Sequence, residues 1–461
     1  MTGWNPTATR WLLAGALVVG YAALCFAIWW RERAKRQRAA AEAAALAAAR
    51  QGVDALLVVY ASQTGQAQEI ALETARQLHA AGEPVRICPM HELTPDALQA
   101  ARHVLWVLST CGEGDPPDHA ARFASEVMAR ALDLSRLRYG LLSLGDRQYT
   151  HFCGFGRSVD AWLQRCGATQ SFVPVEMDNG DPQALQQWQA SLAQVAHVSD
   201  LSAWRAPEFE NWTLSHRLHL NPGSAGSPVF HIELAPPEGA AGPLAWESGD
   251  LVQVRPPQEP DRPREYSIAS VASDGRVHLL VRQLLRPDGT QGVASTWLTH
   301  GAPLGSAVAL RLRPHSNFRL EENARRPLIL IGNGTGLAGL RGHLRARQAL
   351  QAGPNWLIWG ERNAALDFHY QHELKAWLQQ GHLQRLDAVF SRDQPHRVYV
   401  QHVLRDEADT VRAWVAQGAA LYVCGSLQGM AQEVDQMLRL ILGAQPLDDL
   451  LRQGRYRRDV Y

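Results

Sequence analysis

Residues 56–67 read LLVVYASQTGQA, an apolar run that ends in a loop of hydroxyl, amide and glycine residues. The run 56–60 has the length and composition of a buried strand, and residues 67–80 repeat apolar positions at the spacing of an amphipathic helix. Hydroxyl groups, a glycine and the free N–H groups of a helix start suit a phosphate monoester. The loop contains no Lys, which excludes a Walker-type loop. Taken alone, the segment is more often an ordinary Ser/Thr helix cap. The candidate ligand-binding residues are Ser62, Gln63, Thr64, Gly65, Gln66 and Ala67.

Two further apolar strands, VLWVLS (104–109) and YGLLSLG (139–145), are each followed by a polar loop and a helical pattern. This alternation predicts a parallel sheet that is covered by helices on both faces. Ligands of such sheets bind beyond the carboxyl ends of the strands, so three polar loops at neighbouring strand ends indicate one binding site. The second and third loops contribute Ser109, Thr110, Cys111, Gly112, Glu113, Gly114, Leu144, Gly145, Asp146, Tyr149, Phe152 and Cys153.

The segments SQTGQA (62–67), STCGEGDPPD (109–118) and LGDRQYTHFC (144–153) resemble, in this order, the flavodoxin-like FMN domain of diflavin reductases. That family includes sulfite reductase flavoproteins and NADPH–haemoprotein reductases. The resemblance implies that 62–67 hold the FMN phosphate, that 110–114 and 145–153 flank the isoalloxazine ring, and that Tyr149 stacks on it. Cys111 stands where several relatives carry a second aromatic residue, which implies a ring covered on one side only. We interpret Cys111 as a passive loop residue rather than a nucleophile.

Residues 212–315 contain short alternating runs with Gly and Pro between them, which predict an antiparallel barrel after a linker at 198–211. An Arg can neutralise a pyrophosphate, a glycine-led helix start adds N–H donors, and a Tyr can lie against an isoalloxazine ring. Each of these features alone is more often plain packing. Together they resemble the FAD site of the ferredoxin–NADP reductase superfamily. The resemblance implies flavin contacts by Arg264, Tyr266 and Ser267, and pyrophosphate contacts by Gly292, Val293, Ala294 and Ser295.

From Pro327 the pattern returns to alternating strands and helices, and the strand LILI (328–331) leads into a glycine-rich loop. A second segment, residues 391–401, contains two Arg, a Ser and a Tyr within nine residues. These side chains suit a dianionic phosphate, although a solvated charged loop is the alternative. The resemblance implies an NADPH-binding domain with a 2′-phosphate site at residues 391–401. Asn333 and Gly339 stand where the superfamily usually has Pro, so we expect a looser loop. The candidate residues are Gly334, Thr335, Gly336, Ser391, Arg392, Arg397, Tyr399 and Gln401.

Four residues are candidates for catalysis: Ser267, Cys424, Asp459 and Tyr461. The resemblance implies that Cys424 lies beside the nicotinamide and that Asp459 joins it and Ser267 around the hydride path. It also implies that the terminal Tyr461 covers the FAD ring and moves before the nicotinamide can stack. A buried structural thiol is the alternative for Cys424.

The segment GDLVQV (249–254) is separated from REYS (264–267) by nine residues. Relatives of the diflavin type carry a helical connecting domain just before the second segment, and nine residues leave no room for it. We therefore expect the linker 198–211 alone to set how the FMN lobe faces the FAD lobe. A mobile pair of lobes, with interflavin transfer gated by domain motion, follows from this expectation.

Residues 11–30, WLLAGALVVGYAALCFAIWW, form an uncharged run that would span about 30 Å as a helix, the thickness of a bilayer core. Five basic residues follow within 31–38, which places the C-terminal side in the cytoplasm by the positive-inside rule. A cleaved signal peptide fits poorly, because its basic cluster would precede the apolar run. We predict a single-pass anchor in the inner (cytoplasmic) membrane and a stalk at 31–51.

The 461 residues include 45 basic and 45 acidic side chains, and zero net charge argues against a protein that coats nucleic acid. The net charge is zero because charges of opposite sign in different parts of the chain cancel. Residues 1–51 carry 7 basic and 2 acidic side chains, residues 52–197 carry 10 basic and 16 acidic, and residues 198–461 carry 28 basic and 27 acidic. Glu113, Asp115 and Asp118 lie beside the proposed flavin, which predicts docking to a basic face of an acceptor. The six Cys lack disulfide or zinc-ligand spacing, so we expect a reducing compartment and no metal.

These observations predict an FMN domain at 52–197, an FAD-binding barrel at 212–324 and an NADPH-binding domain at 325–461. We expect a flavoprotein reductase that passes electrons from NADPH to FAD, to FMN and then to an external haemoprotein or sulfite-reductase-like partner. One alternative is a membrane-bound ferric or siderophore reductase with the same flavins. An electron-inert membrane scaffold is an alternative of another class.

Overall fold

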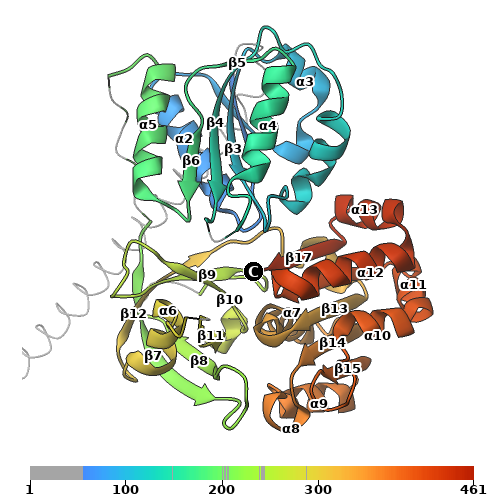
Figure 1. Cartoon of the computed structure of the whole chain (residues 1–461). Helices are drawn as coiled ribbons and strands as arrows, with labels where there is room; N and C mark the ends of the chain where they lie inside the picture. Colours follow the sequence, from blue (N-terminus) through green and yellow to red (C-terminus); the bar gives the residue numbers. More distant parts are fainter. Residues whose placement is uncertain are drawn as a thin grey trace, which may run out of the picture.

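The computed structural model describes residues 55–461, except 148, 200, 202–203, 205–206, 238, 240–243 and 287. One lobe lies above a pair of domains that are packed side by side, and the C-terminus lies where all three meet (Figure 1). The predicted membrane segment 11–30 and the stalk 31–51 lie outside the described residues. Within the described ranges, no helix has the length and apolar character needed to cross a bilayer.

The upper lobe contains a parallel sheet in the order β2-β1-β3-β4-β5, with β6 alongside β4. The strands are β1 (Leu56–Ala61), β2 (Val85–Pro89), β3 (His103–Ser109), β4 (Arg138–Gly145), β5 (Thr169–Gln170) and β6 (Val175–Asp178). Successive strand residues point to opposite faces, so Val58 packs under one pair of helices and Val59 under the other. The predicted doubly covered parallel sheet is therefore confirmed.

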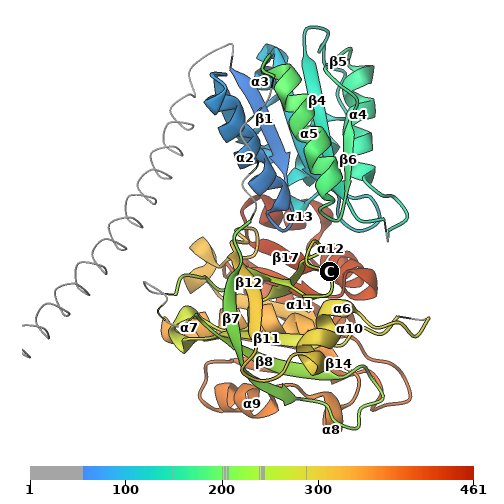
Figure 2. The same ribbon diagram turned by 90° about the vertical axis from the view of Figure 1, so that its left-hand side faces the viewer.

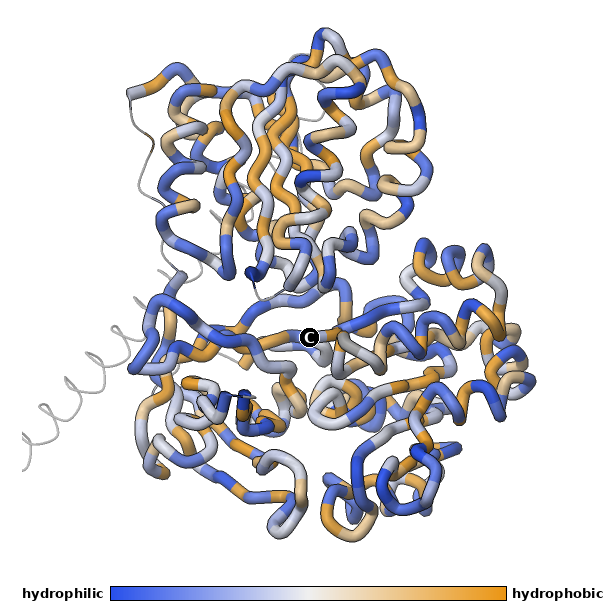
Figure 3. The backbone as a smooth tube through the Cα atoms, in the orientation of Figure 1, coloured by the Kyte–Doolittle hydropathy of each residue, from blue (hydrophilic) through white to orange (hydrophobic). Residues whose placement is uncertain are grey.

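Helices α2 (Gln66–Ala80) and α5 (Pro182–Val195) cover one face of this sheet, while α3 (Pro95–Ala100) and α4 (Gly154–Arg165) cover the other (Figure 2). Apolar residues run along the central strands, as Figure 3 shows. Their arrangement leaves the loops after β1, β3 and β4 at one edge of the sheet, facing the other two domains.

The second domain is an antiparallel sheet in the order β10-β9-β12-β7-β8-β11, and its interior contains the side chains of Trp212, Leu214, Ile232 and Leu234. The strands are β7 (Glu210–His219), β8 (Val229–Ala235), β9 (Leu251–Arg255), β10 (Arg264–Ser267), β11 (Val277–Arg282) and β12 (Ala307–Arg313), with the short helix α6 (Val293–Thr296). The first strand, β7, begins two residues inside the predicted linker. Arg264 pairs with Val254, so β9 and β10 are directly joined neighbours and no domain is inserted between them.

The third domain has a parallel sheet in the order β15-β14-β13-β16-β17. Its strands are β13 (Leu328–Asn333), β14 (Asn355–Glu361), β15 (Arg385–Phe390), β16 (Ala420–Gly425) and β17 (Tyr456–Val460). Its helices are α7 (Leu337–Ala349), α8 (Ala364–Asp367), α9 (Gln371–Gln379), α10 (Val400–Asp406), α11 (Ala408–Ala416), α12 (Gln432–Leu442) and α13 (Ala444–Arg452). The last strand, β17, forms the sheet edge that lies beneath the upper lobe (Figure 1).

Direct contacts join the upper lobe to both other domains. Arg311 on β12 forms a two-pronged ion pair with Glu69 on α2, with N–O distances of 2.5 and 3.0 Å. Arg458 on β17 donates from Nε to Asp118 Oδ2 at 3.0 Å. The expectation that the linker alone sets how the lobes face each other is wrong, because these contacts lie far from the linker in sequence.

Candidate functional site

The loop after β1 combines a left-handed glycine with a side-chain cap. Gly65 has a φ of 89°, a conformation that favours glycine, and it directly precedes α2. Ser62 Oγ accepts a hydrogen bond from Ala67 N at 3.1 Å, which holds the loop against the start of the helix. Both the cap interpretation and the phosphate-loop interpretation are compatible with this geometry.

The outer side of this loop is bound by the barrel segment 313–317, which sequence reasoning missed. Asn317 Nδ2 donates to the carbonyl oxygens of Ser62 and Gln63 at 2.8 and 3.0 Å. His315 Nε2 lies 3.0 Å from the same Gln63 oxygen. The segment follows β12 and resembles an ordinary polar turn, so no signal in the sequence points to it.

The loops after β3 and β4 pack together backbone to backbone. Gly114 has a φ of 114°, and a Cβ atom there would lie 2.9 Å from His151 Cβ. Glu113 Oε2 accepts a hydrogen bond from Thr150 N at 2.9 Å, which ties the two loops to each other. Thr110 Oγ1 is buried without a protein partner among the described residues, so it offers a hydroxyl to a polar ligand atom.

The aromatic and thiol residues of these loops have different surroundings. Tyr149 is partly buried, while Phe152 lies against the guanidinium groups of Arg147 and Arg157, at 4.8 and 5.9 Å from the ring centre. Cys153 is buried and its Sγ donates to Ser143 O at 3.3 Å. Tyr149 is therefore better placed than Phe152 to cover a planar ligand, and Cys153 contributes to packing.

Cys111 is a poor nucleophile in this setting. Burial, followed by the negative charge of Asp118, raises the pKa of its thiol well above the ordinary value. The thiolate is the reactive form of cysteine, so a raised pKa keeps this residue unreactive at neutral pH. Its Sγ lies 3.7 Å from Gln63 Oε1, which links the loop after β3 to the loop after β1.

A cavity of about 500 Å³ lies where the three domains meet. Its walls include Thr64 from the upper lobe, Tyr266 and Ser267 from β10, and Asp459 and Tyr461 from the end of the chain. This volume falls within the usual range for ligand sites, roughly 300 to 1,000 Å³. The cavity therefore joins the predicted phosphate loop to the predicted flavin and hydride residues.

Three of the predicted catalytic residues meet behind this cavity. Ser267 Oγ donates to Asp459 Oδ2 at 2.7 Å, and Cys424 Sγ lies 3.6 Å from the same oxygen. The pairing of β16 with β17 places Cys424 opposite Asp459, and all three side chains are buried. Burial and the Asp459 charge raise the pKa of the Cys424 thiol, so the thiol remains protonated and can donate to the carboxylate.

Tyr461 has the geometry of a movable cover. Its backbone N donates to Gly425 O at 3.1 Å, and its own carbonyl oxygen accepts from Leu427 N at 2.9 Å. Its side chain is 54% exposed and is held mainly by a 3.3 Å contact between its hydroxyl and Thr335 Oγ1. The backbone is therefore anchored, and the partly exposed residue lies in the wall of the cavity.

Arg264 and the segment 292–295 lie outside the set of residues that lines the cavity. Arg264 donates to Glu259 Oε2 at 3.2 Å and to Arg262 O at 2.6 Å. Gly292 N donates to Leu284 O at 2.8 Å, and Ser295 Oγ accepts from Leu284 N at 3.1 Å. The predicted pyrophosphate segment thus supports Leu284, which does line the cavity.

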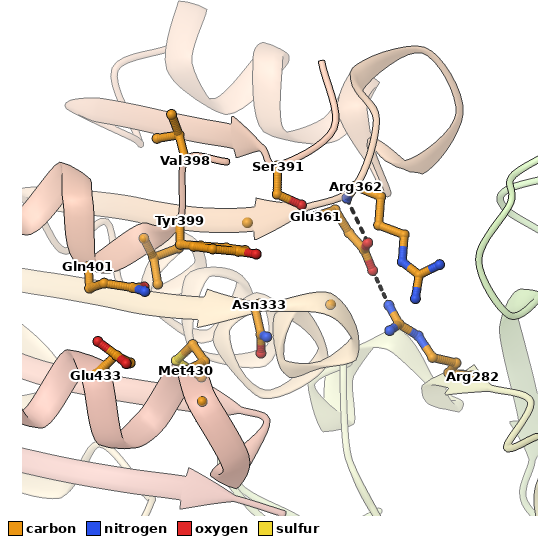
Figure 4. A pocket seen from close by; sticks show the side chains of 14 residues that line it. Arg282, Asn333, Glu361, Arg362, Ser391, Val398, Tyr399, Gln401, Met430 and Glu433 are labelled. Carbon is orange, nitrogen blue, oxygen red and sulfur yellow. Dashed lines mark hydrogen bonds and ion pairs between the residues drawn. The ribbon is translucent and has the colours of Figure 1, made fainter. Parts of the chain in front are cut away.

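A second cavity of about 420 Å³ opens beside the glycine-rich loop (Figure 4). It contains four predicted residues, Gly334, Ser391, Tyr399 and Gln401. Arg392 and Arg397 are exposed and lie outside the lining set. Sequence reasoning named Asn333 only as a departure from Pro and missed Arg282, Glu361, Arg362, Val398, Met430 and Glu433. Arg362 follows directly after the parallel strand β14, so the rule that ligands bind beyond strand ends could have found it.

The glycine-rich loop contacts the segment after β16. Asn333 Oδ1 accepts from Ser426 N at 3.0 Å, which ties the loop to the segment after β16. A Cβ atom at Gly339 would lie 3.3 Å from Cys424 Sγ, so the small residue lets α7 approach Cys424 closely. Asn333 therefore forms a contact that Pro could not form, and the expectation of a looser loop stays a prediction.

Comparison with known proteins agrees with this architecture. Residues 58–190 match the flavodoxin family, and residues 330–436 match the oxidoreductase NAD-binding domain family. The chain is 29% identical to the sulfite reductase [NADPH] flavoprotein alpha-component of Aliivibrio fischeri, with 91% of each chain covered. It is 29% identical to the same component of Shewanella sp. (strain MR-7), covering 89% of this chain and 90% of the relative. The Bacillus subtilis component is 26% identical, with 88% and 89% covered.

The alignment with the Aliivibrio fischeri protein spans 549 positions, 88 more than this chain has residues. The relative thus contains residues without a counterpart here, in agreement with the direct β9–β10 connection. With a flavodoxin domain, an NAD-binding domain and coverage of about 90% on both sides, the chain is similar over nearly its whole length to sulfite reductase flavoproteins, which supports the predicted resemblance to diflavin reductases.

Proposed function

We propose that this chain is an NADPH-dependent diflavin oxidoreductase that passes electrons from NADPH to FAD, to FMN and then to an external acceptor. One observation carries the proposal: Thr64 of the upper lobe lines the same cavity as Tyr266, Ser267 and Tyr461. The two proposed flavin sites therefore adjoin without an intervening domain. When bound, FAD accepts a hydride and releases single electrons, which FMN relays.

In the upper lobe, residues 62–67 bind the FMN phosphate through the loop and the start of α2. Gly65, with its positive φ, lets the backbone approach the phosphate, and the buried hydroxyl of Thr110 offers a partner to a polar flavin atom. Tyr149 covers the ring. These features fit FMN because a phosphate site and a half-buried aromatic residue lie on adjacent loops of one sheet edge.

In the barrel and the third domain, Tyr266 and Tyr461 enclose the flavin ring, and Ser267 with Asp459 forms the polar end of the cavity. Asp459 is buried and accepts hydrogen bonds from Ser267 and Cys424, so its charge is held at a defined position. A fixed negative charge there favours the positive charge that develops on a nicotinamide as it loses hydride. Tyr461 must swing aside before the nicotinamide can stack.

The second cavity binds the NADPH phosphate end. Arg362, Ser391 and Tyr399 line it and provide one cation and two hydroxyl groups. Arg392 and Arg397 lie exposed in the same segment and can attract a dianionic phosphate from solvent. This donor set favours NADPH over NADH, which lacks the 2′-phosphate.

The acceptor is a protein that reaches FMN when the upper lobe separates from the barrel. Asn317 and His315 cover the phosphate loop, and Arg458 pairs with Asp118. Asp118 therefore belongs to the internal contact, and Glu113 and Asp115 remain for an external basic face. We propose a haemoprotein acceptor by analogy with the relatives, which are named as components of sulfite reductase.

We also propose that residues 11–30 anchor the chain in the cytoplasmic membrane.

The test is the flavin content and electron transfer of the purified full chain. We expect one FAD and one FMN per chain, and reduction of cytochrome c by NADPH much faster than by NADH. Absence of FMN after gentle purification would overturn the proposal of two flavins per chain. A colourless protein, which would contain no flavin, would favour the electron-inert scaffold. Reduction of ferric chelates without reduction of cytochrome c would favour the ferric reductase.

A further inference from the structure

Three neighbouring strands of the barrel present histidines around one glutamate. Glu233 on β8 pairs with His216 on β7 and with His278 on β11. His231 lies two residues before Glu233 on the same strand, and therefore on the same face of the sheet. The opposite face carries Ile232 and Leu234 into the barrel core. The four polar side chains thus gather on the outer face.

The distances within this cluster suit a small cation. One ring nitrogen each from His231 and His278 and one carboxylate oxygen of Glu233 all lie within 4.8 Å of one another. His231 Nε2 and Glu233 Oε1 are 3.3 Å apart. Tetrahedral zinc with bonds of about 2.0–2.1 Å separates its ligand atoms by about 3.3 Å. His216 lies next to this group, with its ring centre 6.2 Å from that of His231, but it is not among the residues whose ligand atoms come together.

The surroundings orient the donor atoms. The hydroxyl of Tyr370 lies 2.8 Å from His231 Nδ1 and can accept a hydrogen bond from it. In that tautomer the lone pair of Nε2 is available to a cation that lies between Nε2 and Glu233. Metal-binding histidines usually have such a partner on the second nitrogen. Arg276 occupies only Glu233 Oε2, at 2.8 Å, and leaves Oε1 to the cluster. The nearby cation Arg341 is already paired with both oxygens of Glu373, at 2.6 and 3.0 Å.

From this geometry we propose that His231, Glu233 and His278 bind a divalent transition-metal ion of the zinc type, with water completing the shell. Two imidazoles and one carboxylate, with a water in the fourth position, form one of the tetrahedral ligand sets that bind zinc in proteins. Tyr370 directly precedes α9 of the third domain, so the bound ion would fasten the barrel to that domain. The site is separate from the proposed flavin cavity and from the proposed NADPH cavity, because none of its ligands lines either one.

The test uses the flavin-loaded full chain, stripped with a chelator and titrated with Zn²⁺ against a fluorescent zinc indicator. We expect one tightly bound ion per chain. His278→Ala and Glu233→Gln should each weaken binding by at least about 100-fold, because each removes one protein ligand. His79→Ala removes an exposed histidine on α2 and should leave the affinity unchanged. Co²⁺ in place of Zn²⁺ should give the intense visible absorption of a tetrahedral complex.

Equal affinity in the wild type and in both ligand variants would overturn the proposal, as would the absence of a stoichiometric site. The volume-preserving Glu233→Gln variant decides the question if His278→Ala loses its flavin. Thermal unfolding provides a second readout. Zn²⁺ should raise the melting temperature of the wild type and of His79→Ala but not of Glu233→Gln, and an equal rise in all three would also count against the site.

Discussion

The contact between Asp118 and Arg458 is expected to control how fast electrons pass between the two flavins. Asp118 Oδ2 accepts from Arg458 Nε at 3.0 Å and from Gln63 Nε2 at 3.1 Å, and Arg458 also donates to Oδ1. Both side chains are largely buried at the lobe contact, with 16% and 25% exposed. Asp118→Asn keeps the shape of the side chain but leaves the Arg458 charge without its main partner.

The expected magnitude follows from the bonds that are lost. A hydrogen bond to a charged group contributes about 1.5–3 kcal/mol, so the docked arrangement should weaken by about 2 kcal/mol, or roughly 30-fold. In single-turnover stopped-flow experiments, reduction of FAD by NADPH should keep its rate. Reduction of FMN should slow as the docked fraction falls, and cytochrome c reduction should become less sensitive to salt.

Asp115→Asn is the matched control, because Asp115 is an exposed acid of the same loop. If FMN reduction in Asp118→Asn stays within twofold of this control, the contact does not limit transfer and the reasoning is refuted. An equal slowing of FAD reduction would also refute it, since the substitution would then act on the whole fold rather than on docking.

Three further predictions concern the hydride site, cofactor choice and pH. Ser267→Ala should slow FAD reduction about 10- to 100-fold by removing a 2.7 Å hydrogen bond to Asp459, while Ser270→Ala in the same segment should not; equal rates would exclude Ser267 from the hydride step. Arg362→Ala should raise the KM for NADPH about 10- to 100-fold and leave the KM for NADH unchanged, and a parallel rise in both would contradict phosphate recognition. Burial alone would raise the pKa of Glu69, but hydrogen bonding and attraction from Arg311, with a smaller contribution from Arg313, outweigh burial and lower it. Its contribution to lobe docking is therefore complete above its ordinary pKa of 4.5 and is lost as pH falls through the lowered value, so Glu69→Gln should remove this acid sensitivity of FMN reduction.

The direct lobe contacts change how domain motion is understood in this chain. Without a connecting domain, the expectation from the sequence was a pair of lobes related only by a linker. Instead, the segment 313–317 binds the outer side of the phosphate loop, and Arg458 reaches across from β17. Neighbouring residues of a strand point to opposite faces, so Arg458 contacts the upper lobe while Asp459 faces the hydride cavity. The end of the chain therefore contributes to both sites.

Local pattern was sufficient for the elements and for many candidate residues. The strands 56–61 and 103–109, the helix 66–80 and the absence of an insert before β10 follow from apolar periodicity and from loop length, which are properties of neighbouring residues. The loops after parallel strands were predictable for the same reason, because the sheet brings the ends of its strands to one edge. The role of Arg264 stays a prediction, because it lies outside the residues that line the cavity although Tyr266, on the same face of β10, lines it.

By itself, the sequence determined the order of the three domains and the glycine-rich and hydroxyl-rich loops, and the family resemblance pointed to Ser267, Cys424 and Asp459, which contact one another. Only the tertiary structure decided which surfaces of those domains touch. Asn317 and Ser62 are 255 residues apart, and the His231, Glu233 and His278 cluster depends on the register of two paired strands, β8 and β11. The physical reason is that such contacts arise from strand pairing and domain packing, so no spacing along the chain records them.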